Sequence, residues 1–159
     1  MAEYSYDILL DRLAALCSQK EKSEYDAYSY LQKKGVPSAE CQKAVDYLVK
    51  NRFIDNQRFA TAFARDKARF DKWGVKKIAA ALSAKKIDQH TIQEAVGQIS
   101  GEQQKETILA ETTKKAKGIK DLSTPQAKAK LLRFCAGRGY PPALSLQIIN
   151  QITNKQYNQ

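Results

Sequence analysis

The spacing of the apolar residues is the feature that most constrains the fold of this chain. Apolar side chains recur at intervals of three and four residues almost throughout, and no segment sustains an alternation with a period of two. The first spacing gathers apolar side chains on one face of a helix, whereas a half-buried strand requires the second. A chain of 159 residues is also long enough to bury a core. The sequence therefore predicts an all-α fold.

Capping residues mark where the predicted helices begin and end. Ser, Asp and Thr side chains accept hydrogen bonds at a helix start, proline fits the first helical position, and glycine adopts the left-handed turn after a helix. The helix that follows Asp55 should run to about Lys72. Gly35 is the predicted stop, and the predicted starts are Ser38, Asp55, Asp88, Thr124 with Pro125, and Pro141 with Pro142.

The apolar pattern also repeats along the chain. A shift of 51 residues places Val36 on Ile87, and a further shift of 53 places Ile87 on Tyr140. The same helix end recurs at Lys34-Gly35-Val36, Lys85-Lys86-Ile87 and Arg138-Gly139-Tyr140. A period near 50 indicates a tandem array of three-helix units, each packing partly on its neighbour. We expect three such repeats in an elongated, curved array, over residues 1–54, 55–100 and 101–159, with a polar C-terminal tail from Asn154.

Composition and motifs exclude several classes of protein. No apolar run approaches the roughly 20 residues that span a bilayer, and residues 1–11 lack the basic and apolar regions of a secretory signal, so a cytoplasmic protein is expected. Three distant cysteines and one histidine make neither a disulfide framework nor a zinc site. We expect each cysteine to be buried, and no metal or cofactor to be bound. The cysteines are Cys17, Cys41 and Cys135.

The chain lacks the residue patterns of the common enzyme classes. It contains no glycine-rich phosphate loop, and its single histidine, His90, lies beside the predicted cap Asp88 without a G-x-S-x-G motif. A surface histidine is the interpretation that this position favours. No grouping of base, nucleophile and electrophile emerges, so we expect a protein that is not an enzyme and has no catalytic residues.

Charge gives the strongest indication of function. The chain carries 27 basic and 17 acidic residues, a net charge of +10, and residues 51–86 alone hold 10 basic and 3 acidic ones. Such a local excess is typical of proteins that bind a polyanion or an acidic surface, with nucleic acid as the first expectation. A solvated surface that only confers solubility is the alternative.

The helix predicted after Asp55 carries two separate stripes. At about 100° per residue its aromatic side chains fall on one side, where we expect them to be core. Its basic side chains fall on another, with only Asp66 and Asp71 as possible partners, so they are free to contact phosphates or carboxylates. The aromatic stripe is Phe59, Phe63 and Phe70, and the basic stripe is Arg58, Arg65, Arg69 and Lys72.

The basic surface is expected to continue past this helix. Trp73-Gly74 breaks the helix, and Lys76 and Lys77 open the next one. Trp73 is either part of the core or an exposed interface anchor. A second, weaker basic cluster lies in the third unit, and it is more often a solvated face than a site. Its members are Lys128, Lys130, Arg133 and Arg138.

In its second and third units the chain resembles the RecX family of bacterial regulators of the recombinase RecA. The resemblance covers residues 9–152, with the first unit matching only in its apolar pattern. In the second unit it rests on Phe53-Ile54-Asp55, Arg58-Phe59-Ala60, Ala62-Phe63, Lys67, Arg69, Trp73-Gly74 and Lys77-Ile78. In the third unit it rests on Lys130-Leu131-Leu132-Arg133-Phe134 with Gly137-Arg138-Gly139-Tyr140.

The resemblance implies three tandem three-helix repeats that bind in the groove of the RecA–DNA filament. There the family inhibits strand exchange and ATP hydrolysis by RecA, in DNA repair and the SOS response. The expected partners are therefore RecA and the phosphates of single- or double-stranded DNA, and we expect a monomer. Carried over residue by residue, the binding surface falls on Arg58, Arg65, Lys67, Arg69, Lys72, Lys76 and Lys77.

The chain departs from the family pattern at two points. Val75 stands where many relatives have proline, and the first unit is acidic rather than basic, which suits contact with RecA better than contact with DNA. The alternative function is a DNA- or RNA-binding module of the helix-turn-helix type. Base reading would require more exposed amides than the thinly spread Gln42, Gln93 and Gln147, so phosphate contact is favoured.

Overall fold

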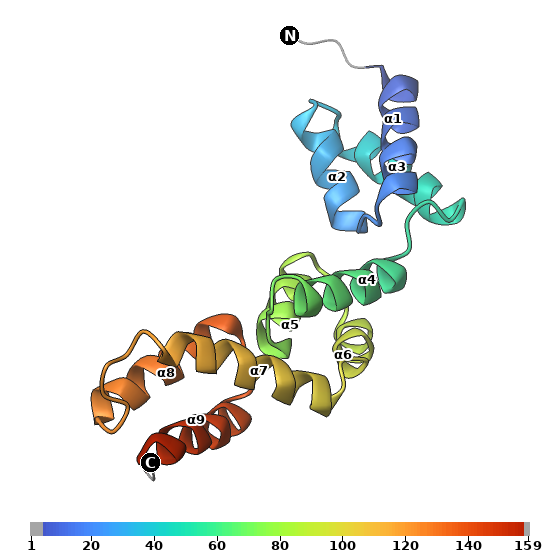
Figure 1. Ribbon diagram of the computed structural model, residues 1–159. Helices are drawn as coiled ribbons and strands as arrows, with labels where there is room; N and C mark the ends of the chain where they lie inside the picture. The colour runs from blue at the N-terminus through green and yellow to red at the C-terminus, as the bar shows by residue number, and fades with distance from the viewer. Residues whose placement is uncertain (1–4, 158–159) are drawn as a thin grey trace.

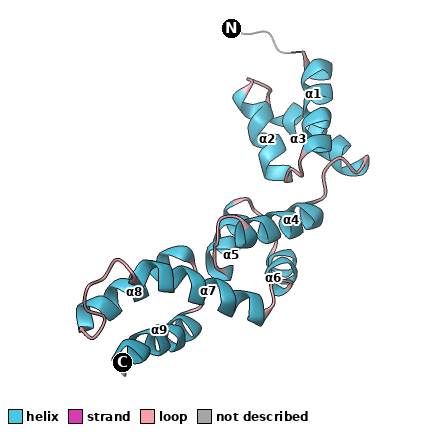
Figure 2. Ribbon diagram, in the orientation of Figure 1, coloured by secondary structure: helices cyan, strands magenta, loops and turns pink. Residues whose placement is uncertain are grey.

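The structure, a computed structural model, describes residues 5–157, with side chains to Asn154. Nine α-helices and no strand occur within that range (Figures 1 and 2), which confirms the all-α prediction. Residues 1–4 of the acidic start and 158–159 of the predicted tail lie outside it. The helices are α1 Tyr6–Gln19, α2 Glu24–Lys33, α3 Ser38–Lys50, α4 Asn56–Arg69, α5 Val75–Ala84, α6 Gln89–Gly97, α7 Gly101–Ala116, α8 Pro125–Arg138 and α9 Pro142–Tyr157.

The helices form three groups along an elongated molecule. We call α1–α3 the first unit, α4–α6 the second and α7–α9 the third. Figure 1 shows the first unit at the N-terminal end, the second in the middle and the third at the C-terminal end, with the two termini far apart. The closest helix packing occurs inside the units, as in α2 on α3, α4 on α6 and α8 on α9.

Each unit has a hydrophobic core of its own. The repeat positions Leu31, Leu82 and Cys135 are at most 1% exposed and lie in three separate clusters. Cys17 and Cys41 are buried as well, so the interpretation of the three cysteines as core residues is confirmed. Between residues 5 and 157, no helix combines the length and the apolarity that crossing a bilayer requires.

One type of turn joins the second helix of every unit to the third. Gly35, Lys86 and Gly139 have φ values of 87°, 60° and 82°, so all three adopt the left-handed conformation. The next residue in each case is buried, and its N–H donates to the carbonyl five residues earlier, at 3.0 to 3.2 Å. This is the Schellman arrangement, in which a left-handed residue satisfies the last carbonyls of a helix. The shared helix end that the sequence indicated is therefore one structural motif used three times.

The predicted helix starts hold with one exception. Asp55, Asp88 and Thr124 accept backbone N–H groups of the helices that they open, and α9 begins at Pro142. Ser38 is wrong as a cap, because Pro37 holds the cap position and no side chain bonds there.

The end of α4 differs from the prediction. The helix ends at Arg69 rather than near Lys72, because the chain turns at Phe70 and Lys72 takes a left-handed conformation with φ 59°. Phe70 is therefore 69% exposed. The expectation that Phe59, Phe63 and Phe70 all lie in the core is wrong for Phe70. Its backbone is still helical and it lines the same groove as the other two rings, but it stays exposed at the end of the helix and does not belong to the second core.

Candidate binding surface

The exposed side of α4 presents Arg65 and Arg69. The Asp55 cap fixes the start of the helix, and burial of Phe59 and Ala60 fixes its rotation, so both arginines face away from the core. Arg65 Nε lies 3.3 Å from Asp66 Oδ1, but the Arg65 side chain stays 66% exposed, and such a surface pair contributes little. The Arg69 guanidinium lies 5.4 Å from the centre of the Phe70 ring. No carboxylate of the described residues lies within ion-pair distance of Arg69.

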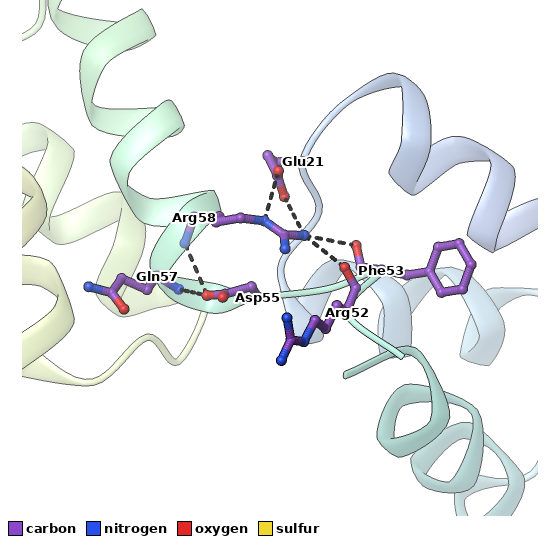
Figure 3. A network of polar contacts seen from close by, with 6 residues as sticks. All are labelled: Glu21, Arg52, Phe53, Asp55, Gln57 and Arg58. Atoms are coloured by element: carbon purple, nitrogen blue, oxygen red, sulfur yellow. Dashed lines mark hydrogen bonds and ion pairs between the residues drawn. The ribbon is translucent and has the colours of Figure 1, made fainter. Parts of the chain in front are cut away.

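Arg58 occupies a different environment, at the start of the same helix (Figure 3). Its Nε donates to Glu21 Oε1 at 3.1 Å, and its Nη2 donates to Glu21 Oε2 at 3.4 Å and to the carbonyl of Arg52 at 3.1 Å. Arg58 thus joins the second unit to the first. The expectation that only Asp66 and Asp71 could pair with the basic stripe is wrong here, because Glu21 comes from a segment 37 residues earlier.

Lys67 and Lys77 flank the indole of Trp73. Their Nζ atoms lie 4.7 and 4.5 Å from the ring centre, well within the range of cation–π interactions. Lys67 Nζ also lies 3.1 Å from Asp71 Oδ2. Trp73 is half-buried against the second core and meets the Phe63 ring edge-on at 6.3 Å. Its position therefore combines features of the core and surface alternatives, and its ring orients two of the predicted site residues.

Lys72 and Lys76 lie where the second unit meets the third. The carbonyl of Lys72 accepts a hydrogen bond from the Tyr140 hydroxyl at 2.7 Å. The N–H of Gly74 donates to the Arg138 carbonyl at 2.7 Å, and that of Lys76 to the Gly139 carbonyl at 3.0 Å. Both lysine side chains are exposed, with no carboxylate of the described residues in ion-pair distance. We call this contact of residues 72–77 with 138–140 the second junction.

The Trp73-Gly74 break therefore has a structural purpose that the sequence did not reveal. A Cβ on Gly74 would lie 2.2 Å from the Gly139 carbonyl oxygen, and one on Gly139 would lie 2.3 Å from Lys77 Cβ. Two backbones can approach this closely only where both residues lack a side chain. The two glycines were visible in the sequence, but nothing there indicated that they meet.

The first and second units meet through polar side chains. Asn56 accepts the N–H of Glu24 at 2.9 Å and donates to Glu24 Oε2 at 2.8 Å, and Lys85 forms an ion pair with Asp26. Burial raises the pKa of Asp26, but hydrogen bonds and charge from Lys85, with hydrogen bonds from Ser23, outweigh it and lower that pKa. We call these contacts, together with Arg58–Glu21, the first junction. Sequence reasoning missed them, since none connects residues of one helix.

The weaker cluster on α8 does not form one face. Arg138 Nη1 lies 3.8 Å from Glu111 Oε2, and its guanidinium lies 5.0 Å from the centre of the Phe134 ring. Lys128 is half-buried. Lys130 and Arg133 are exposed and about 60° apart around the helix, whereas Arg138 lies about 140° from Arg133. Only Lys130 and Arg133 therefore present their charges to solvent together.

The described residues contain no grouping that resembles a metal centre. No three potential ligands among His, Cys, Asp and Glu come together within residues 5–157. His90 is exposed, with Nε2 3.0 Å from Glu94 Oε1, so its interpretation as a surface histidine is confirmed.

Comparisons of the sequence with known proteins identify its relatives. A sequence model described as "RecX, second three-helix domain" matches residues 55–96. A "Regulatory protein RecX" from Clostridium botulinum strain Alaska E43 is 27% identical over 138 residues, covering 86% of this chain and 64% of that protein. One from Vibrio parahaemolyticus is 28% identical over 125 residues, covering 79% of each. This chain thus spans less than two thirds of the Clostridium relative.

Comparison with solved structures gives the same fold. A crystal structure of RecX from Lactobacillus salivarius matches 92% of this chain with a TM-score of 0.78 and 16% identity, and the match covers 96% of that chain. A "Crystal structure of regulatory protein RecX" matches 94% with a TM-score of 0.79 and 17% identity, covering 71% of that chain. The arrangement of nine helices within residues 5–157 is therefore one that solved RecX structures share.

Proposed function

We propose that this chain is a member of the RecX family of regulatory proteins and that it inhibits the recombinase RecA by binding in the groove of the RecA–DNA filament. It would do so as a monomer and without covalent chemistry. The second unit would lie against DNA phosphates and acidic protein surface, and the outer units would span neighbouring RecA subunits. Occupation of the groove would obstruct the incoming DNA and the subunit motion that ATP hydrolysis requires.

One observation carries this proposal. Four of the seven predicted site residues are exposed and have no carboxylate of the described residues in ion-pair distance other than Asp66, the sequence neighbour of Arg65. We call them the basic surface: Arg65, Arg69, Lys72 and Lys76. Exposed cations without strong internal partners retain their charge for a polyanion, and each phosphate they contact releases counterions. Inhibition should therefore weaken steeply as salt rises. Arg58, Lys67 and Lys77, which have partners inside the chain, are assigned a supporting role.

The second junction suits this function because it fixes where the cations lie. Backbone hydrogen bonds from Gly74 and Lys76 anchor the segment that carries Lys72 and Lys76 to the third unit. Anchored groups lose less conformational entropy on binding than mobile ones do. The elongated arrangement in Figure 1 offers an extended surface of the kind that tandem repeats use for long partners.

The test is charge reversal on the basic surface. We expect R65E/R69E to raise the concentration that half-inhibits the ATPase activity of RecA on single-stranded DNA by at least about tenfold, because several phosphate contacts are lost. The matched control is K105E/K114E, the same change in charge on exposed positions of α7 outside the predicted sites. Circular dichroism verifies that both variants keep their helices.

Two results would contradict the proposal. One is inhibition by R65E/R69E at wild-type concentrations. The other is a sequence-selective gel shift on naked DNA or RNA without any inhibition of RecA, which would identify the helix-turn-helix type of binding module instead.

A further inference from the structure

The left-handed turn of the second unit carries a lysine where the other two units carry glycine. Lys86 has φ 60°, and its equivalents Gly35 and Gly139 have 87° and 82°. A side chain in this conformation crowds the following carbonyl, a strain that glycine avoids. The backbone of the second unit would therefore be more stable with glycine at position 86.

The three turns differ in what else they require. Gly139 must lack a side chain, because its Cβ would meet Lys77, whereas a Cβ on Gly35 would meet nothing within 4 Å. Strain alone thus explains glycine in the first unit, and the same strain is tolerated in the second. The Lys86 side chain is exposed, and no described carboxylate lies within ion-pair distance. Residues held in a strained conformation concentrate at functional positions.

Lys86 lines a groove between the first two units. The groove measures about 640 Å³, within the usual range of ligand sites, and its other lining residues include Tyr25, Tyr28, Gln32, Asn56 and Lys85. Tyr25 is 41% exposed and belongs to none of the three cores. Its ring contacts neither another ring nor a cation among the described residues. The groove thus offers an aromatic face and an unpaired cation.

The charges in the groove favour an anionic occupant. Among the described residues, Glu24 is the one carboxylate that lines the groove, and its Oε2 already accepts from the Asn56 amide. Lys85 is held by Asp26, which leaves Lys86 as the cation that can contact a ligand. Proteins that hold single strands combine a cation for the phosphate with an aromatic ring on which a base stacks. An acidic peptide would engage Lys86 but would leave the Tyr25 ring without a counterpart.

We propose that this groove binds single-stranded nucleic acid, with Lys86 contacting a phosphate and Tyr25 stacking on a base. The site lies outside the basic surface and gives the first unit a direct nucleic-acid contact, which the acidic character of that unit did not suggest. The proposal rests on the proposed function in one respect: it takes the bound strand to be the DNA on which RecA assembles.

The experiment measures binding of the full chain to a fluorescein-labelled 20-residue oligo(dT) by anisotropy, from 25 to 300 mM KCl. The variants are Lys86→Gly and Tyr25→Ala. Arg52→Gly is the matched control, because Arg52 is also an exposed cation in a left-handed conformation, with φ 61°, but does not line the groove. Tyr25→Phe, which keeps the ring, tests whether stacking is the interaction that matters.

We expect both glycine variants to raise Tm by about 2–4 °C, since each relieves backbone strain. Lys86→Gly alone should weaken binding and reduce the slope of log K against log[KCl] by about 0.7, the value for one phosphate on a single strand. Tyr25→Ala should weaken binding about tenfold, whereas Tyr25→Phe, which keeps the ring, should bind with wild-type affinity.

Three results would overturn the proposal. The first is a Lys86→Gly variant that matches Arg52→Gly in both affinity and salt slope. The second is wild-type binding by Tyr25→Ala. The third is unchanged oligo(dT) binding by both groove variants together with loss of RecA inhibition, which would mean that the groove receives a protein surface. Failure of R65E/R69E to affect RecA is a separate result, so the two proposals can fail independently.

Discussion

Single residues set the geometry of the second junction. Gly74 and Gly139 bring two backbones so close that a methyl group on either would overlap the other chain segment, and the N–H of Gly74 donates to Arg138 across the gap. Position 139 requires glycine for two reasons, the close approach and a φ of 82°, which favours glycine. At Gly74 the requirement comes from the close approach alone.

Gly74→Ala should therefore destabilise the protein by more than about 2 kcal/mol, because the backbone must move and the hydrogen bond to Arg138 is lost. Urea unfolding measures the change. The matched control is Gly97→Ala, where a Cβ meets nothing within 4 Å and alanine favours the helix by up to about 1 kcal/mol. Equal stability of Gly74→Ala and wild type would show that the two backbones do not approach this closely.

At the scale of elements, the end of α8 lies against the start of α5. The carbonyls of Arg138, the last residue of α8, and of Gly139, its C-cap, accept the N–H groups of Gly74 and Lys76 at the start of α5. Both helix ends thereby satisfy groups that would otherwise lack partners, and their dipoles are aligned favourably. Tyr140 completes the contact, with its ring buried and its hydroxyl on the Lys72 carbonyl.

The titration of Tyr140 should make this contact sensitive to alkaline pH. Burial raises the pKa of Tyr140 to about 12, from an ordinary value of 10. The fold favours the neutral phenol, so the stabilisation is complete below pH 10 and is lost as pH rises from 10 through 12. Trp73, the single tryptophan, lies beside the junction and reports on it by fluorescence during urea unfolding.

Tyr140→Phe should lower stability at pH 8 by about 1 kcal/mol through loss of the hydrogen bond to Lys72. The variant should also lose less stability than wild type between pH 10 and 12, because phenylalanine has no group that titrates. The difference between the two proteins isolates Tyr140 from the other groups that titrate in that range. Parallel pH curves for wild type and variant would mean that Tyr140 does not control the junction.

At the scale of the whole molecule, the two junctions differ in kind. The second is made of backbone hydrogen bonds and close backbone contact, whereas the first consists of side-chain contacts, chiefly Arg58–Glu21 and Lys85–Asp26. Ion pairs at partly exposed positions weaken as salt rises, because mobile ions screen them. The first unit should therefore turn against the rest of the molecule more readily than the third.

Distances between spin labels can test this difference. Labels at Ser18→Cys and Gln89→Cys span the first junction, and labels at Gln89→Cys and Gln126→Cys span the second, all at exposed positions. Raising NaCl from 50 to 500 mM should broaden the first distance distribution and leave the second unchanged. Arg58→Ala should broaden the first at low salt. If both label pairs gave narrow distance distributions at 50 and at 500 mM NaCl, the first junction would not be sensitive to salt.

Much of the candidate site followed from the sequence, but its partners did not. Helical spacing placed Arg65 and Arg69 together on the exposed side of α4, where the structure has them. It could not show that Glu21 engages Arg58, or that the rings and charges of Trp73 and Asp71 hold Lys67. Nor could it separate Lys72 from the helix, since the turn at Phe70 depends on what the chain packs against next.

The sequence by itself determined the helices, most of their caps, the recurring turn at Gly35, Lys86 and Gly139, and the buried cysteines. The helices, caps and turns depend on interactions within about five residues, so their signals lie side by side in the chain. The cysteines were predicted from the apolar character of a free thiol, although their burial comes from packing within the units. Only the tertiary structure decided the two junctions, because they join residues 37, 59 and 68 positions apart. Apolar periodicity predicts which face of a helix is buried, but it does not predict which distant segment packs against the ends of that helix.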